Sequence, residues 1–209
     1  MRGTDNKTDK VILGIDPGTN IMGYGLIKIT GKDATLIHLD VITMQREGDH
    51  FLKLKRIFEE TVRIIQHYKP DEVALEAPFY AKNIQSMLKL GRAQGISMAA
   101  ALYHNLPVFE YSPRKVKQSI TGKGSSSKEQ VAIMLQRILT LNELPKKLDA
   151  TDALAVAICH FFQNRVGGNS KPDKKFNSWQ AFISENPNKI SSPKSAGWRG
   201  FEGLENKKT

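Results

Sequence analysis

The sequence predicts an α/β fold in which a five-stranded mixed sheet is flanked by helices. Early in the chain, apolar runs of strand length are joined by very short links, and such links make neighbouring strands antiparallel. Two later strand patterns each follow a segment of helical periodicity, which makes them parallel crossovers. The expected order is three antiparallel strands followed by parallel ones.

The first three strands are expected at residues 11–17, 21–30 and 33–44. The tight links Pro17-Gly18 and Gly31-Lys32 connect them. A helix should follow over residues 50–68, where apolar residues recur at helical spacing, and Pro70 closes it. The next strand is expected at residues 73–76, parallel to the first.

The longest helical pattern covers residues 83–104 and is apolar on two sides. Small residues at Gly91, Gly95 and Ala99 lie along one of these sides and permit close approach of a second helix. We expect the sheet to cover one side and a second copy of the chain to cover the other, as in a homodimer. A helix buried on both sides within one domain is the alternative.

The remainder of the core is predicted as one strand and three helices. The strand covers residues 108–111, and a short helix begins after Ser112-Pro113 and breaks at Gly122. The last two helices are expected at residues 128–141 and 146–162. We divide the chain into an N-terminal extension (1–10), a core domain (11–163) and a basic, flexible tail (164–209) with a short helix at 178–183.

The bulk composition favours a polyanionic partner. The 209 residues carry a net charge of +10, and the isoelectric point is near 9.6. The single cysteine, Cys159, lies in an apolar run and is expected to be a buried structural thiol in a reducing compartment. The sequence has no apolar run of membrane-spanning length, so we expect a cytoplasmic protein without a membrane partner.

Four acidic residues are the candidates for chemistry. Asp16 and Glu76 end neighbouring parallel strands, and Asp149 and Asp152 share one face of a helix built of alanine and leucine. If that helix crosses the same sheet edge, four carboxylates meet in one cleft and need cations to offset their repulsion. Oxygen ligands of this kind suit Mg²⁺ or Mn²⁺, and paired metal ions of this kind cleave phosphodiesters. The alternative for the helical pair is a solvated or capping role.

The chain from about Val11 to His160 resembles the RuvC-type Holliday junction resolvases, which have an RNase H-like fold. Four sequence blocks carry the resemblance: Gly14-Ile-Asp16-Pro-Gly18; Leu75-Glu76 with Phe79-Tyr-Ala-Lys-Asn83 and Lys89-Leu-Gly91; Val116-Lys117-Gln118 with Gly122-Lys-Gly-Ser125 and Lys128; and Asp149-Ala-Thr-Asp152-Ala-Leu154. The resemblance implies that Asp16, Glu76, Asp149 and Asp152 are the catalytic and metal-binding acids, with two Mg²⁺ per site and Mn²⁺ as a substitute.

The resemblance also implies the substrate and partners. Lys117 and Lys128 look like the family's basic residues near the scissile phosphate, and Phe79 like its aromatic wedge at the crossover. Lys82 and Lys123, in the same blocks, are expected to contact DNA. The implied function is symmetric paired cutting of four-way DNA junctions in recombination and repair, by a homodimer that works with the RuvA–RuvB branch-migration complex.

Three other readings remain for comparison. A ribonuclease H-like enzyme acting on RNA or on an RNA–DNA hybrid would share the fold and the acids. A non-catalytic junction-binding protein is disfavoured because four repelling acids would serve no purpose in it. An ATP-handling fold of the actin and hexokinase kind would need a second, duplicated domain, for which about 150 core residues leave no room.

Overall fold

The computed structural model describes residues 9–78, 83–143 and 148–167, and it confirms the predicted mixed sheet of five strands. The strands, in chain order, are β1 (Lys10–Asp16), β2 (Ile21–Thr30), β3 (Asp33–Thr43), β4 (Glu72–Glu76) and β5 (Val108–Tyr111). The helices are α1 (His50–Tyr68), α2 (Ile84–Tyr103), α3 (Pro113–Thr121), α4 (Lys128–Ile138) and α5 (Leu148–Gly167). The strands lie in the order β3-β2-β1-β4-β5.

The pairing of the strands follows from the length of their connections. β1, β2 and β3 are joined by short turns and pair antiparallel, whereas β4 and β5 are reached through helices and pair parallel. In the register of β1 and β4, Ile15 lies opposite Leu75. The next residue of each strand, Asp16 and Glu76, therefore ends its strand at the same edge of the sheet.

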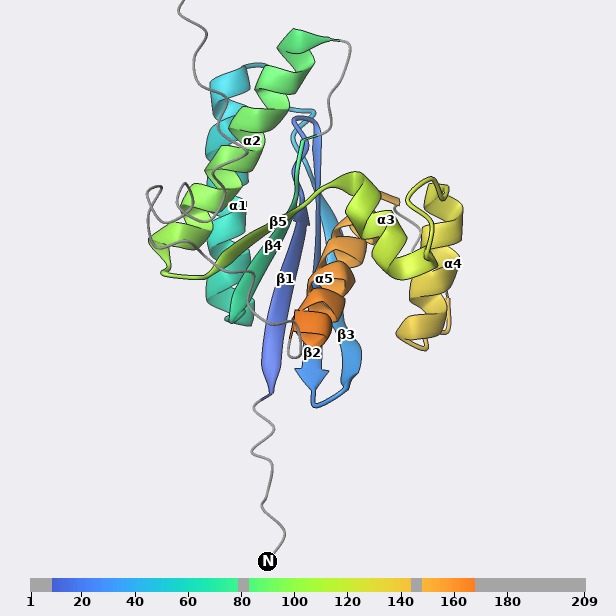
Figure 1. The fold of residues 1–209 in the computed structure, drawn as a ribbon. Coiled ribbons are helices and arrows are strands. Elements are labelled where there is room, and N and C mark those ends of the chain that lie inside the picture. Colours follow the sequence, from blue (N-terminus) through green and yellow to red (C-terminus); the bar gives the residue numbers. More distant parts are fainter. Residues whose placement is uncertain (1–8, 79–82, 144–147, 168–209) are drawn as a thin grey trace, which may run out of the picture. The chain divides into compact units, whose positions relative to one another are not determined.

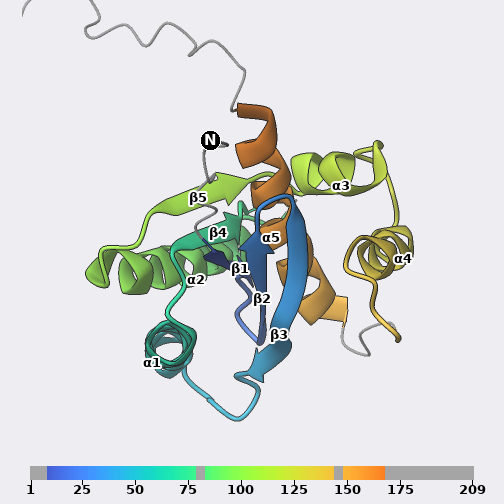
Figure 2. The ribbon, with the colours of Figure 1, turned by 90° about the horizontal axis from the view of Figure 1, so that it is seen from below.

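Helices α1 and α2 cover one face of the sheet, and α3, α4 and α5 lie on the other (Figures 1 and 2), so each face has its own core. Along β1, Leu13 and Ile15 pack with α1 and α2, while Ile12 packs with α3, α4 and α5. This alternation is the period of two expected of a strand buried on both faces. Lys10, Gly14 and Asp16 are spaced from Ile12 by even numbers of residues and lie on the same face of the strand. Asp16, at the end of β1, therefore faces the side of the sheet that α5 covers.

Helix α5 lies unusually close to the sheet because glycines stand beneath it. A Cβ built at Gly14 would lie 2.1 Å from the carbonyl oxygen of Ala153, and one at Gly23 would lie 2.0 Å from that of Asp149. Only glycine therefore fits at these two positions. The first turn of α5 is thereby held against the edge at which Asp16 stands.

A few boundaries differ from the sequence predictions. α4 ends at Ile138 rather than at residue 141, because Thr140 adopts a left-handed backbone conformation with φ of 51°. α5 continues to Gly167, past the predicted end at 162. Most of the predicted tail, its helix at 178–183, Phe79 and Lys82 lie outside the described residues. Within the described ranges, no helix has the length and apolar character needed to cross a membrane.

Candidate active site

Asp16 and Glu76 reach the edge of the sheet because their strands end there abruptly. After Asp16 the chain turns through Pro17-Gly18, and a Cβ at Gly18 would lie 1.9 Å from the carbonyl oxygen of Ile21. The turn is therefore too tight for a side chain at that position. Both acids are only partly exposed, and both line one cleft of about 1240 Å³.

The first turns of α5 bring two further carboxylates to the same place. Asp149 and Asp152 are three residues apart and share a face of the helix, as the sequence predicted. Carboxylate oxygens of Asp16, Asp149 and Asp152 all lie within 4.8 Å of one another. Glu76 lines the same cleft but lies outside this group of three.

Basic residues line the same cleft as the acids. Lys117 comes from α3, Lys123 from the loop after it, and Lys128 from the first turn of α4. Lys128 donates its Nζ hydrogen to Asp152 Oδ2 in an ion pair. Three of the five predicted DNA contacts thus line the cleft, and the other two lie outside the described residues.

Helix caps fix where these lysines stand. Ser112 caps α3, with Pro113 as its first residue, and the helix ends at Thr121, before Gly122, whose φ of 77° favours glycine. Ser127 and Gln130 form a capping box at the start of α4. The cap places Lys128 at the first helical position, from which it reaches Asp152.

The acids repel one another strongly. Burial, together with repulsion from Asp152 and Asp149, raises the pKa of Asp16 to about 7. Burial and repulsion from Asp16 and Asp152 raise the pKa of Glu76 to about 8. Burial opposes the charge on Lys128, but the hydrogen bond to Asp152 outweighs it and raises the pKa of this lysine. At pH 7 Glu76 therefore keeps its proton in most molecules and Asp16 in about half of them, so a cation that binds these acids must displace protons.

The donor set fits a hard divalent cation. It consists of carboxylate oxygens from the end of β1 and the first turns of α5, gathered within the span that one ion can bridge. A bound cation would also relieve the repulsion that raises the pKa values of Asp16 and Glu76. No histidine or cysteine belongs to this group among the described residues, so a soft metal is disfavoured.

Two residues of the cleft were missed from the sequence. Arg114 lies three residues before Lys117 on α3, and that helical spacing alone could have indicated a shared basic face. Gln94 of α2 is buried and donates hydrogen bonds to Glu110 Oε1 and to the carbonyl oxygen of Glu76. The sequence feature that could have indicated Gln94 is a polar residue within an apolar strip of a helix.

A mixed sheet that presents carboxylates at its strand ends beside a basic cleft is typical of RNase H-like nucleases. The family model described as crossover junction endodeoxyribonuclease RuvC matches residues 12–160. Proteins of that name from Cytophaga hutchinsonii and Bacteroides fragilis are 55% and 50% identical to this chain. The alignments cover 88% and 87% of this chain and 90% and 96% of those proteins. The chain belongs to the crossover junction endodeoxyribonuclease RuvC family.

Solved structures agree with this assignment. Thermus thermophilus RuvC in complex with a Holliday junction substrate is 33% identical, with a TM-score of 0.71, covering 76% of this chain and 96% of that one. The yeast mitochondrial Holliday junction resolvase Ydc2 is 14% identical with a TM-score of 0.55, and this likeness concerns the fold alone. The RNase H-like fold implied by the sequence blocks is thereby confirmed.

Proposed function

We propose that this chain is a metal-dependent endonuclease that resolves four-way DNA junctions by paired, symmetric strand cuts. The observation that carries the proposal is the group formed by Asp16, Asp149 and Asp152, whose carboxylate oxygens lie within 4.8 Å of one another beside a lysine-lined cleft. The physiological ion is proposed to be Mg²⁺, two per site, with Mn²⁺ as a substitute.

Each part of the cleft has its own task in this reaction. Asp16, Asp149 and Asp152 would hold the ions, with Glu76 as the further acid of the set. When bound, the ions supply an activated water and stabilise the departing oxygen. Lys117 and Lys123 bind the phosphate backbone and hold the DNA against the acids. The ammonium group of Lys128 offsets negative charge that builds on the phosphate as the bond breaks.

The outer face of α2 supports a homodimer. Large apolar side chains on this face are exposed, with Leu88 at 50%, Leu102 at 60% and Ile84 at 65%. Among the described residues, no atom lies within 4 Å of a Cβ built at Gly91 or Gly95. A helix could therefore approach α2 closely along this line. A two-fold dimer would present two cutting sites to the two equivalent strands of a junction.

The dimer is tested by placing a charge on this face. Leu88→Glu should convert the protein to a monomer in light scattering and abolish paired cutting, because the interface would bury an unpaired carboxylate. Ile133→Glu on α4 is the matched control, since Ile133 is also an exposed apolar residue, at 43%. A Leu88→Glu protein that stays dimeric would contradict the proposed interface.

The function is tested by offering one protein three substrates of equal sequence. With Mg²⁺ present, we expect a four-way junction to be cut at symmetric positions, while duplex DNA and an RNA–DNA hybrid are left largely intact. Preferred cutting of the hybrid would show a ribonuclease instead. Junction binding without any cutting would show a binding protein.

Family membership supports three further parts of the proposal. The chain is proposed to act in the cytoplasm and to work with the RuvA–RuvB branch-migration complex. Phe79 is proposed to stack on a base at the opened crossover. Phe79→Ala should then reduce cutting of an intact junction more than cutting of a substrate already open at the crossover, and equal losses would contradict the wedge.

A further inference from the structure

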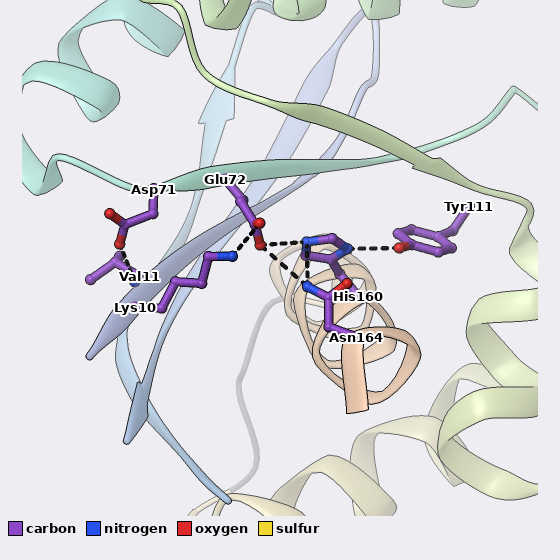
Figure 3. A network of polar contacts seen from close by, with 7 residues as sticks. All are labelled: Lys10, Val11, Asp71, Glu72, Tyr111, His160 and Asn164. Carbon is purple, nitrogen blue, oxygen red and sulfur yellow. Dashed lines mark hydrogen bonds and ion pairs between the residues drawn. The ribbon is translucent and has the colours of Figure 1, made fainter. Parts of the chain in front are cut away.

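A second polar cluster lies on the same face of the sheet as the active-site acids (Figure 3). His160 of α5 is fully buried at its centre. Its Nε2 lies 2.8 Å from Glu72 Oε2, and its Nδ1 lies 2.7 Å from the hydroxyl of Tyr111. Lys10 pairs with Glu72 Oε1, and Asn164 donates to Glu72 Oε2 at 3.3 Å. We call these five residues the His160 network.

One arrangement of hydrogens satisfies the centre of the network. Burial lowers the pKa of His160, although Glu72 opposes this, so the ring is neutral near pH 7. Burial raises the pKa of Tyr111 to about 12, so its hydroxyl keeps its proton. The hydroxyl therefore donates to Nδ1, and the Nε2 hydrogen goes to the Glu72 carboxylate. Each bond depends on the other, because the ring can donate from only one nitrogen.

The network joins the elements that carry the acids. Lys10 begins β1 and Glu72 begins β4, and these strands end at Asp16 and Glu76. Figure 3 shows the side chains of the network spanning from these strand starts to α5. His160 follows Asp152 by eight residues, which is about 12 Å along a helix. With Tyr111 at the end of β5, three strands and one helix are thus tied together at a distance from the cleft.

Such a tie matters because one strip of the contact between α5 and the sheet is formed by small residues. Gly14 lies beneath the helix and meets Ala153 and Ala157, although larger side chains such as Ile12 and Ile158 pack beside this strip. Small side chains interlock little, so they oppose rotation or sliding of α5 less than large ones would. A carboxylate sits about 5 Å from the helix axis, so a rotation of about 15° moves it by roughly 1.3 Å. A misplacement of about 1 Å can lower a reaction rate roughly a hundredfold.

We propose that His160, held between Glu72 and Tyr111, is a positioning residue that fixes the rotation and axial register of α5, so that Asp149 and Asp152 meet Asp16. This inference rests on the proposed function of the acids. It differs from a purely stabilising role, because it ties the network to the geometry of the metal ligands. Loss of the network should impair metal binding even where the protein stays folded.

The test compares network variants with stability-matched controls. Tyr111→Phe removes one hydroxyl group, and His160→Leu removes both hydrogen bonds of the ring. His160→Gln keeps a donor and an acceptor and should fall between wild type and His160→Leu. Cys159→Ala and Ile158→Ala are the controls, because both residues are buried in α5 next to His160 but outside the network. All proteins are assayed well below their melting temperatures.

Three quantities are measured for each protein. These are the Mn²⁺ affinity by calorimetry without DNA, the junction affinity without metal, and the single-turnover cutting rate as a function of Mg²⁺. We expect Tyr111→Phe and His160→Leu to weaken Mn²⁺ binding by about tenfold, as loss of a ligand-orienting partner does. The Mg²⁺ concentration for half-maximal rate should rise by a similar factor, while junction affinity stays within about twofold, since phosphate contacts carry it.

Two results would overturn the positioning role. The first is a set of Mn²⁺ affinities that match those of the controls at equal loss of melting temperature. The second is a loss of junction affinity as large as the loss of metal affinity, which would indicate general disorder. Should His160→Leu fail to fold, Tyr111→Phe decides the question alone. A wild-type protein that does not cut junctions would contradict the proposed function, and the Mn²⁺ affinities would still decide the role of His160.

Discussion

Two glutamates on β4, four residues apart on one face of the strand, have opposite environments. Glu72 is nearly buried, yet hydrogen bonds from Lys10 and His160 outweigh that burial and lower its pKa. Glu76 meets Asp16 and Asp152 instead, and burial together with their repulsion raises its pKa to about 8. One end of the strand stabilises its charged carboxylate within the protein, whereas the environment at the other end disfavours the charged form of Glu76.

The difference indicates what each end contributes. A buried carboxylate with matched donors holds neighbouring elements together. Clustered carboxylates destabilise the metal-free fold and are retained where a cation or a phosphate is to be bound. We interpret the Glu72 end as the support of the helix that carries Asp149 and Asp152, and the Glu76 end as the chemical site.

The largest expected effect comes from removing single charges at the Glu76 end. Asp16→Asn, Glu76→Gln, Asp149→Asn and Asp152→Asn should each lower the cutting rate by about a thousandfold or more, because each removes an ionised oxygen ligand. Junction binding should survive, since phosphate contacts carry the affinity. Gel shift and cutting assays on each variant measure both properties.

The matched control for these substitutions is Glu129→Gln. Glu129 is an exposed acid beside Lys128 on α4 and does not line the cleft. Its cutting rate should stay within about threefold of wild type, as expected for a surface charge. Near-normal cutting by any one of the four acid variants would remove that residue from the chemical site.

A smaller effect is expected from the lysine that faces the acids. Lys128→Met should lower the cutting rate by about a hundredfold, because removing one well-placed charge donor typically costs that much. Lys28→Met is the control, since Lys28 also forms an ion pair, with Asp9 at 2.7 Å, but lies on β2 away from the cleft. Single-turnover kinetics with saturating protein measure both rates. Equal rates for the two variants would show that the Lys128–Asp152 pair is structural.

The two ends of β4 should respond to pH with opposite signs when no metal is present. The pKa of Glu76 rises from 4.5 to about 8 on folding, so the folded state binds the extra proton and stability falls as pH rises across that window. The pKa of Glu72 falls on folding, so its contribution is complete above its ordinary pKa and is lost as pH drops through the folded value.

Two substitutions separate these contributions in denaturation curves. Glu76→Gln should raise the free energy of unfolding at pH 8 by about 1–3 kcal/mol, because it removes a buried, repelled charge. Glu72→Gln should lower it by about 1–3 kcal/mol, because charged hydrogen-bond partners lose their acceptor. A loss of stability in Glu76→Gln at pH 8 would contradict the contrast between the two glutamates.

The comparison also shows which features the sequence could predict. Asp16 and Glu76 were predictable because each directly follows an apolar strand, and parallel strands bring their ends together. Asp149 and Asp152 were predictable as well, because residues three apart in a helix share one face. These features need only the periodicity of one element and the order of the strands.

The His160 network was not predictable in the same way. Lys10 and Glu72 each lie one residue outside the strands expected from the sequence, so no strand pattern singles them out. His160 stands within the apolar run that ends at Phe162, where no spacing marks a partner for it. The partners of His160 are 49 and 88 residues away in the chain. Their contact depends on the exact register of β1, β4 and α5, which periodicity does not determine.

Proton release on metal binding tests the central contrast most directly. The wild-type protein is titrated with Mn²⁺ at pH 7 by calorimetry, in buffers of different ionisation enthalpy. The account predicts tight binding with release of protons, because Asp16 and Glu76, with pKa values of about 7 and about 8, must lose protons when a cation arrives. Glu76→Gln should release fewer protons. Binding without proton release, or no Mn²⁺ binding at millimolar concentration, would contradict the account.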